Sequence, residues 1–259
     1  MLAYVGPPVT AWTLVVDPPA SLLQQCTAAR EQTSGCDNPD GWGIGWYPAP
    51  GEPERYRTST PMPADDAGLA RLAELVSGHF VAHIRLKSPG SPVEVAGNAH
   101  FVDGPWMFAH NGHVEGFREG RREELRAQLT PARRAALAGD ADSEVLFGLL
   151  CDTLDRGVDA VDAVGQLVCS LGEGNYNLFL SDGSRLIACR WGNTLYLRRD
   201  DPLDGATLVV SEPHDERPGW EPVPDRSLVV VEQGEVAVVP VEGAAGPEVA
   251  RRDPMEAHQ

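Results

Sequence analysis

Glycine and proline divide this chain into short apolar segments, and this punctuation restricts its fold more than any other feature. The two residue types account for 49 of 259 positions. That share is high for a helical bundle and too low for a disordered chain. Apolar runs bounded by such residues are typical of strands. We predict strands over residues 43–47, 80–85, 106–110, 176–180, 186–190, 207–211, 227–232 and 235–239.

Residues 80–85 show the strand period most clearly. Successive side chains of a strand point to opposite faces. The even positions (Phe80, Ala82, Ile84) are apolar throughout, whereas the odd positions include His83 and Arg85. One face of this strand therefore belongs to a core, and the other carries polar groups. Between the last two predicted strands, Gln233-Gly234 is a candidate hairpin turn.

Helical periodicity is present in fewer segments. Apolar residues recur at the 3.6-residue period in 69–76, 145–154 and 158–168,. Candidate capping residues precede the first two, namely Asp65 or Asp66, and Asp142 or Ser143,. Residues 118–134 are rich in Arg and Glu, which favours a solvated helical face broken near Thr130-Pro131. Strands, helices and then strands again predict an α+β chain with two packed sheets and helices outside. We expect one domain over 1–259, with a frayed tail after about residue 241.

Charge and cysteine content exclude several classes of function. The chain has 21 basic and 38 acidic residues, so its net charge is −17. This disfavours nucleic acid and anionic membranes as partners. No apolar stretch is long enough to span a bilayer, and the first residues lack the pattern of a secretory signal. The five cysteines are scattered and form no Cys-x-x-Cys pair, so we expect reduced thiols in a cytoplasmic protein.

Three short stretches could carry chemistry. Glycines at alternate positions in residues 40–46 leave one strand face bare, for a ligand or for a closely packed neighbour,. Arg85, at the end of an apolar strand, could bind the carboxylate of a ligand or form an ion pair with one of the acidic residues. Asn111-Gly112 could offer two N–H donors to an oxyanion or form a hairpin turn.

Other kinds of site lack support in the sequence. His83, His100, His110 and His113 are close in sequence, but no His-x-x-x-His pair or dedicated carboxylate accompanies them,. We therefore expect neither a metal site nor a cofactor. The chain has no Gly-x-Ser-x-Gly elbow and no phosphate-binding loop.

In order along the chain, the motifs resemble those of class II glutamine amidotransferases, which are N-terminal nucleophile hydrolases. They are Asp40-Gly41-Trp42-Gly43, Ala82-His83-Ile84-Arg85, Ala109-His110-Asn111-Gly112 and Asp142-Ser143-Glu144. Segments 183–195, 211–213 and 224–226 are similar to the branch that cleaves γ-glutamyl-hercynylcysteine sulfoxide in actinobacterial ergothioneine biosynthesis.

The resemblance implies a four-layer αββα sandwich and an amidohydrolase that releases glutamate from a small γ-glutamyl amide. Arg85 would bind the α-carboxylate of the substrate and Asp142 its α-ammonium group. The side-chain amide of Asn111 and the N–H of Gly112 would form the oxyanion hole. His110 and the backbone of Asp40, Gly41 and Trp42 would complete the substrate pocket.

The sequence departs from the family pattern at its first residues. The resemblance implies a cysteine nucleophile exposed as residue one, whereas here Leu2 follows Met1, and Cys26 and Cys36 lie too far along,. Either Met1 is an internal residue of Met-Cys-Arg-Met-Leu, or the chain binds γ-glutamyl ligands without cleaving them. The nine nucleotides before the Met1 codon separate these hypotheses. A glutaminase subunit that supplies ammonia to a separate partner is a further alternative.

Overall fold

The first of two antiparallel sheets contains the amino-terminal strand at its centre. The computed structural model describes residues 1–259 except 33–34, 49–50, 88–93, 201 and 242–259, so the tail expected after about residue 241 lies outside the described residues. The strand order in this sheet is β11-β9-β10-β1-β4-β2-β3. Its strands are β1 (Leu2–Thr10), β2 (Trp42–Trp46), β3 (Glu54–Thr58), β4 (Val76–Ile84), β9 (Tyr196–Arg199), β10 (Thr207–Val210) and β11 (Glu221–Pro222).

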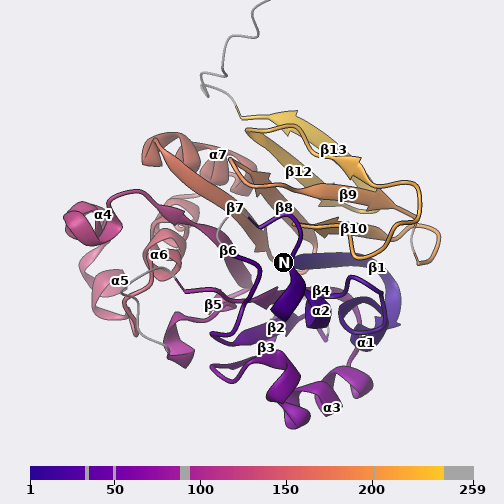
Figure 1. Cartoon of the computed structure of the whole chain (residues 1–259). Coiled ribbons are helices and arrows are strands. Elements are labelled where there is room, and N and C mark those ends of the chain that lie inside the picture. Colours follow the sequence, from indigo (N-terminus) through magenta and orange to yellow (C-terminus); the bar gives the residue numbers. More distant parts are fainter. Residues whose placement is uncertain (33–34, 49–50, 88–93, 201, 242–259) are drawn as a thin grey trace, which may run out of the picture.

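The second sheet packs against the first and has the order β13-β12-β8-β7-β6-β5. Figure 1 shows both sheets. Its strands are β5 (Phe101–Asp103), β6 (Trp106–Val114), β7 (Gly174–Ser181), β8 (Arg185–Arg190), β12 (Ser227–Glu232) and β13 (Glu235–Pro240). Strands β12 and β13 meet at Gln233-Gly234, both with positive φ, as the sequence predicts for a tight hairpin,.

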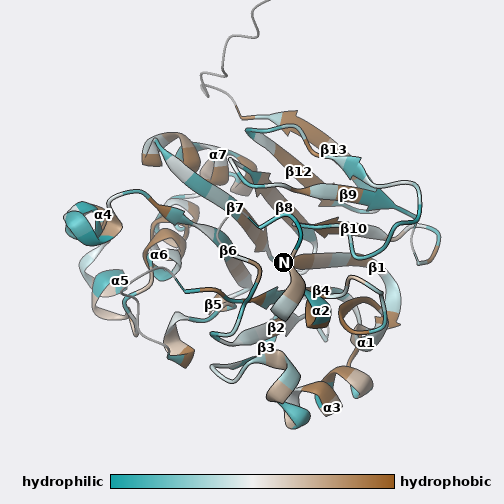
Figure 2. Ribbon diagram, viewed as in Figure 1, coloured by the Kyte–Doolittle hydropathy of each residue, from teal (hydrophilic) through white to brown (hydrophobic). Residues whose placement is uncertain are grey.

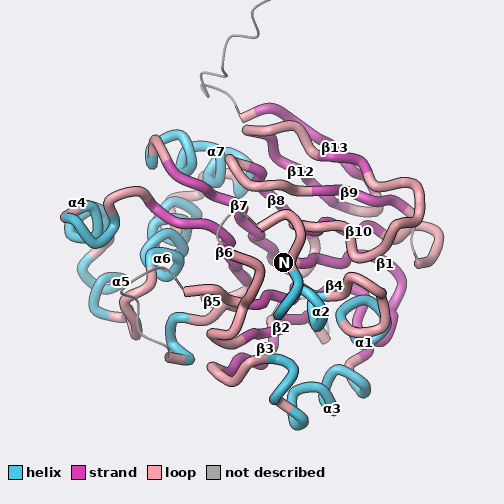
Figure 3. The backbone as a smooth tube through the Cα atoms, viewed as in Figure 1, coloured by secondary structure: helices cyan, strands magenta, loops and turns pink. Residues whose placement is uncertain are grey.

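Helices cover the outer faces of the two sheets, as the tube drawing shows (Figure 3). The α-helices are α1 (Ala11–Val15), α2 (Leu22–Ala28), α3 (Asp66–Glu74), α4 (Arg121–Gln128), α5 (Pro131–Ala135), α6 (Asp142–Leu154) and α7 (Ala160–Leu171). Short 3₁₀ turns are η1 (Met62–Ala64), η2 (Val95–Gly97) and η3 (Phe117–Glu119). Helices α4 and α5 are largely hydrophilic, as expected for the charged segment (Figure 2). Among the described residues, no helix has the length and apolarity needed to cross a membrane.

Side-chain alternation along the central strands builds the layers. Leu2, Tyr4 and Phe80 pack under the helices on the outer face of the first sheet. Ala3 and Val81, one position along, belong to the core between the two sheets. A third core joins the outer face of the second sheet to α6 and α7. The predicted four-layer αββα sandwich is therefore confirmed.

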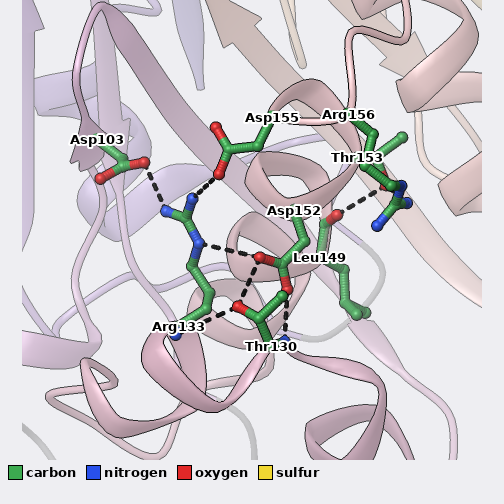
Figure 4. A network of polar contacts seen from close by, with 8 residues as sticks. All are labelled: Asp103, Thr130, Arg133, Leu149, Asp152, Thr153, Asp155 and Arg156. Atoms are coloured by element: carbon green, nitrogen blue, oxygen red, sulfur yellow. Dashed lines mark hydrogen bonds and ion pairs between the residues drawn. The ribbon is translucent and has the colours of Figure 1, made fainter.

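Arg133 ties the short helix α5 to its surroundings through three carboxylates (Figure 4). It pairs with Asp103 at the end of β5, with Asp155 at 2.6 Å and with Asp152 at 3.4 Å. Asp152, only 6% exposed, also accepts hydrogen bonds from the N–H and hydroxyl of Thr130. These contacts fix α5 against α6, the helix whose first turn contributes to the pocket described next.

Candidate active site

A pocket of about 650 Å³ opens where the ends of β1 and β4 in the first sheet meet β6 of the second. The amino terminus lies at the centre of the molecule (Figure 1), and Met1 is only 3% exposed. Five of the residues singled out in the sequence line this pocket: Arg85, His110, Asn111, Gly112 and Asp142. They come from the end of β4, from β6 and from the start of α6, so the fold brings together positions up to 57 residues apart.

Arg85 is a buried cation without an ion-pair partner in the described part of the chain. Arg85 is the residue directly after β4, and it is 8% exposed. Nη1 donates a hydrogen bond to Asn98 Oδ1 at 2.9 Å. Burial lowers the pKa of the guanidinium, whereas the carboxylates of Asp40, Asp142 and Glu94 act in the opposite direction. Because a buried charge is costly without a counter-charge, this site favours an anionic ligand.

Asn98 holds the guanidinium in place and was not identified from the sequence. It is fully buried, its Nδ2 donates to the carbonyl of Thr58, and its carbonyl accepts from Arg57 Nη1 at 3.1 Å. This support comes from a loop thirteen residues after Arg85. An asparagine in a Gly- and Pro-rich stretch resembles any turn residue, so only the contact with Arg85 reveals its role.

Asp142 and His110 lie on either side of the hydroxyl of Ser143, whose single proton can be donated to only one of them,. Ser143 Oγ lies 3.0 Å from His110 Nδ1 and 3.2 Å from Asp142 Oδ1. His110 Nε2 lies 3.3 Å from the carbonyl of Asn175, which can only accept, so this nitrogen carries the proton,. Burial lowers the pKa of His110 despite the opposing effect of Asp142, so the ring is neutral near pH 7. Asp142 Oδ2 accepts from the N–H of Val114 at 3.1 Å.

Asn111 and Gly112 lie within β6 and form no hairpin turn. The strand continues to Val114 and pairs with β7 throughout. The side-chain amide of Asn111 has no hydrogen-bond partner in the described part of the chain and faces the pocket. A Cβ on Gly112 would lie 1.9 Å from the carbonyl oxygen of Asn175, and its φ is +156°. The backbone thus excludes any side chain at this position, beside a free amide donor.

The head of β1 lies between Arg85 and the end of β10. Leu2 pairs with Val210 on one side and Ala82 on the other. The amine of Met1 donates to Ser211 Oγ at 2.8 Å, and the N–H of Ser211 donates to the carbonyl of Met1 at 2.9 Å. Burial lowers the pKa of this amine to about 5, with Glu212 and Cys26 acting in the opposite direction.

Asp40, Gly41 and Trp42, expected at the floor of the substrate pocket, are not among the described residues that line this cavity. Trp42 packs into the core under the helices and donates from Nε1 to Asp65 Oδ2 at 3.0 Å. The carbonyl of Gly41 and the N–H of Asp40 bond to the backbone of Arg85 at 2.9 and 3.1 Å. This stretch holds the segment that carries Arg85.

No cysteine is among the described residues that line the pocket. Cys26 is buried near the amine of Met1, and burial raises the pKa of its thiol to about 12. It is thus a poor source of thiolate at neutral pH. Cys36 is exposed and outside the pocket lining. No group of three His, Cys, Asp or Glu side chains within the described ranges is arranged to hold a metal ion.

Comparison with known proteins finds a matching family model and similar sequences. Residues 12–213 match the family model described as class II glutamine amidotransferases. The γ-glutamyl-hercynylcysteine sulfoxide hydrolase of Mycolicibacterium smegmatis is 35% identical over 245 residues, covering 93% of this chain and 98% of the relative. The hydrolase of the same name from Mycobacterium tuberculosis (strain CDC 1551 / Oshkosh) is 36% identical over 251 residues, covering 95% and 98%.

Solved structures show the same fold at lower identity. A glutamine aminotransferase class-II domain protein from Silicibacter pomeroyi superposes with a TM-score of 0.68 at 24% identity, covering 93% of this chain and 98% of that one. Glutamine phosphoribosylpyrophosphate amidotransferase from B. subtilis also gives 0.68, at 13% identity, with 93% and 49% covered. At these identities the likeness concerns the fold alone.

Proposed function

Because this chain belongs to the class II glutamine amidotransferase family, we propose that its pocket binds a γ-glutamyl amide for hydrolysis to glutamate and a free amine. The observation that carries the proposal is that Arg85, buried and without an ion-pair partner among the described residues, shares one pocket with Asp142 and the side-chain amide of Asn111. An amino-acid end of a ligand carries a carboxylate and an ammonium group. Arg85 matches the first and Asp142 the second.

The remaining groups fit the scissile amide. With the α-carboxylate at Arg85 and the α-ammonium at Asp142, the γ-carbonyl would lie near the head of β1, beside Asn111 and Gly112, which line the same pocket. The amide of Asn111 and the N–H of Gly112 would stabilise the oxyanion of a tetrahedral intermediate. Removal of one such donor typically lowers the rate by about 10²–10³. The backbone N–H groups of Ser143 and Val114 would keep the carboxylate of Asp142 oriented.

The attacking group in this reaction is a thiol whose own α-amine takes its proton. The sulfur adds to the γ-carbonyl carbon, and the proton passes through the amine to the leaving nitrogen as the C–N bond breaks. Water then hydrolyses the thioester, which releases glutamate and restores the thiol. The start of β1 lies next to both Arg85 and the oxyanion donors Asn111 and Gly112. We therefore place the attacking thiol at the start of β1.

We propose γ-glutamyl-hercynylcysteine sulfoxide as the substrate. The mycobacterial relatives named for this hydrolysis are matched over almost their full length. The pocket, at about 650 Å³, has the size of sites for drug-sized ligands and exceeds what glutamine needs,. A bulky leaving group accounts for the additional space.

The test compares two chains, the printed sequence and the same sequence extended by Met-Cys-Arg before Met1, with a Met-Ala-Arg extension as the matched control. Each is incubated with γ-glutamyl-hercynylcysteine sulfoxide or glutamine, and products are identified by mass spectrometry. We expect glutamate release from the sulfoxide by the cysteine-bearing chain alone. Turnover of glutamine only would favour the ammonia-supplying glutaminase. Binding by calorimetry without turnover in any of the chains would instead indicate a γ-glutamyl-binding protein.

A further inference from the structure

The segment 191–195 takes the chain from one sheet to the other beside the pocket. It follows β8 of the second sheet and precedes β9 of the first. Asn193 and Thr194 of this segment line the pocket, as do Asn111 and Ser211. The proposed hydrolysis requires the oxyanion donor on one sheet and the thiol on the other to keep a fixed distance. A segment that crosses between the sheets at this point can set that distance.

Asn177 holds the second-sheet end of the crossing. It is fully buried and lies directly opposite Asn111 in the β6–β7 pair, so the two side chains share one face of the sheet,. Its Nδ2 donates to the carbonyl of Thr194 at 2.7 Å, and its Oδ1 accepts from the N–H of Trp191 at 3.2 Å. Asn193 Nδ2 donates to the carbonyl of Asn111 at 3.5 Å. The crossing is thus bonded to the strands that carry the oxyanion donor.

Thr194 connects the crossing to the first sheet through its hydroxyl. Its Oγ1 donates to the carbonyl of Ser211, the residue directly after β10, at 2.8 Å. The N–H of Ser211 in turn donates to the carbonyl of Met1 at 2.9 Å. A series of hydrogen bonds therefore runs from Asn177, beside the oxyanion donor, through Thr194 and Ser211 to the start of β1.

These bonds add direction to an interface that is largely apolar. Ala3 and Val81 of the first sheet meet Ala109 and Phe179 of the second in the core between the sheets. Apolar burial is non-directional, whereas a hydrogen bond restricts both distance and angle. Stabilisation of an oxyanion depends on donors held at the position where the charge develops. The hydrogen bonds of the crossing therefore supply a constraint that the apolar core does not.

We infer that Thr194 is a positioning residue for the hydrolysis, which holds the start of β1 at a fixed distance from the oxyanion donors of β6. The inference rests on the proposed function, because it concerns attack by a thiol at the start of β1. Thr194 makes and breaks no bond of the substrate and acts through Ser211 and Asn177. Its loss therefore slows the attack on the γ-carbonyl carbon, while Arg85 continues to bind the amino-acid end.

Steady-state kinetics of the full chain extended by Met-Cys-Arg test this inference, with γ-glutamyl-hercynylcysteine sulfoxide and glutamine as substrates. Thr194→Val keeps the shape of the side chain and removes the hydroxyl donor at a half-buried position. We expect kcat to fall about tenfold with KM within about twofold of the parent, because a small displacement of reacting groups acts on the transition state. Thr194→Ser keeps the hydroxyl and should restore most of kcat.

Tyr47→Phe is the matched control for a general loosening of the two sheets. The hydroxyl of Tyr47, after β2 of the first sheet, donates to the carbonyl of Ser181 in β7 of the second, with an oxygen–oxygen distance of 2.8 Å. Neither residue is among the described residues that line the pocket. Tyr47→Phe should lower the urea midpoint at least as much as Thr194→Val and leave kcat unchanged.

An unchanged kcat in Thr194→Val, an equal fall of kcat in Tyr47→Phe, or no recovery in Thr194→Ser would overturn the inference and leave the proposed function intact. If the cysteine-bearing parent hydrolyses neither substrate, the proposed function and the inference fail together.

Discussion

Replacement of Arg85 is the most direct test of how the pocket recognises its ligand. Nη1 is already bonded to Asn98 Oδ1 at 2.9 Å, so Nη2 and the guanidinium charge are left for a carboxylate. In Arg85→Lys the charge is kept, but a single ammonium cannot bond to Asn98 and a ligand in the same fork geometry. Loss of a buried, charge-assisted contact costs about 2–5 kcal/mol. We therefore expect γ-glutamyl ligands to bind at least about 30-fold more weakly.

The assay is calorimetry with a γ-glutamyl amide, alongside steady-state kinetics on a chain with a cysteine ahead of Met1. Arg85→Lys should raise KM with a smaller effect on kcat, because Arg85 grips the ligand in the ground state. Asn111→Ala should instead lower kcat by about 10²–10³, because its amide matters most in the transition state. Arg122→Lys, at the half-buried pair with Asp140 outside the pocket lining, is the control and should match the parent. Parallel kinetic defects in the Arg85 and Asn111 variants would refute the division of roles.

Three further predictions concern stability. Gly112→Ala should lower the free energy of unfolding by about 3 kcal/mol, measured in urea, because its Cβ meets the carbonyl of Asn175 at 1.9 Å; an unchanged midpoint would contradict this close packing,. Asp152→Ala should cost about 3 kcal/mol by leaving the clamp of Figure 4 without its buried carboxylate, whereas Asp155→Ala, at the exposed end, should cost under about 1 kcal/mol,. Burial lowers the pKa of His79 to about 4, so the unfolded chain takes up this proton first as pH falls. The contribution of neutral His79 to the free energy of unfolding is therefore complete above pH 6.5 and is lost as the pH falls toward 4, by up to about 1.4 kcal/mol per pH unit. In His79→Gln the free energy of unfolding, measured in urea, should depend less on pH over this range.

The fold could be predicted because its main signal is local. Strand alternation in residues 80–85 reports which face is covered, and the helical stripes of α6 and α7 report one buried side each. The residue pattern did not predict β1, and β3, β5, β9 and β11 were not predicted either. Of the latter four, three lie at sheet edges and carry polar or charged residues, so they lack the apolar run on which the prediction depends. Their place is set by pairing with a neighbour rather than by their own sequence.

Only part of the site could be predicted, because its contacts join segments that are distant in the sequence. Asn111 and Gly112 look like a hairpin turn when considered alone, and the structure excludes the turn because β7 pairs with both positions. The alternatives for Arg85 were equally open in the sequence, since an ion pair depends on residues brought close by folding. Asn98 was missed altogether: its hydrogen bond to Arg85 joins a loop to a strand end, and no periodic pattern signals such a contact.

A single alternation connects the fold with the chemistry. In β4 the even positions Phe80, Ala82 and Ile84 enter the core under the helices. The same period sends Val81 into the core between the sheets and His83 and Arg85 into the pocket at its end. A one-residue slip of β4 would exchange the two sets, placing a guanidinium among apolar side chains and removing the cation from the ligand site. The hydrophobic cost of that exchange fixes the register of the strand, and the register in turn fixes where Arg85 points.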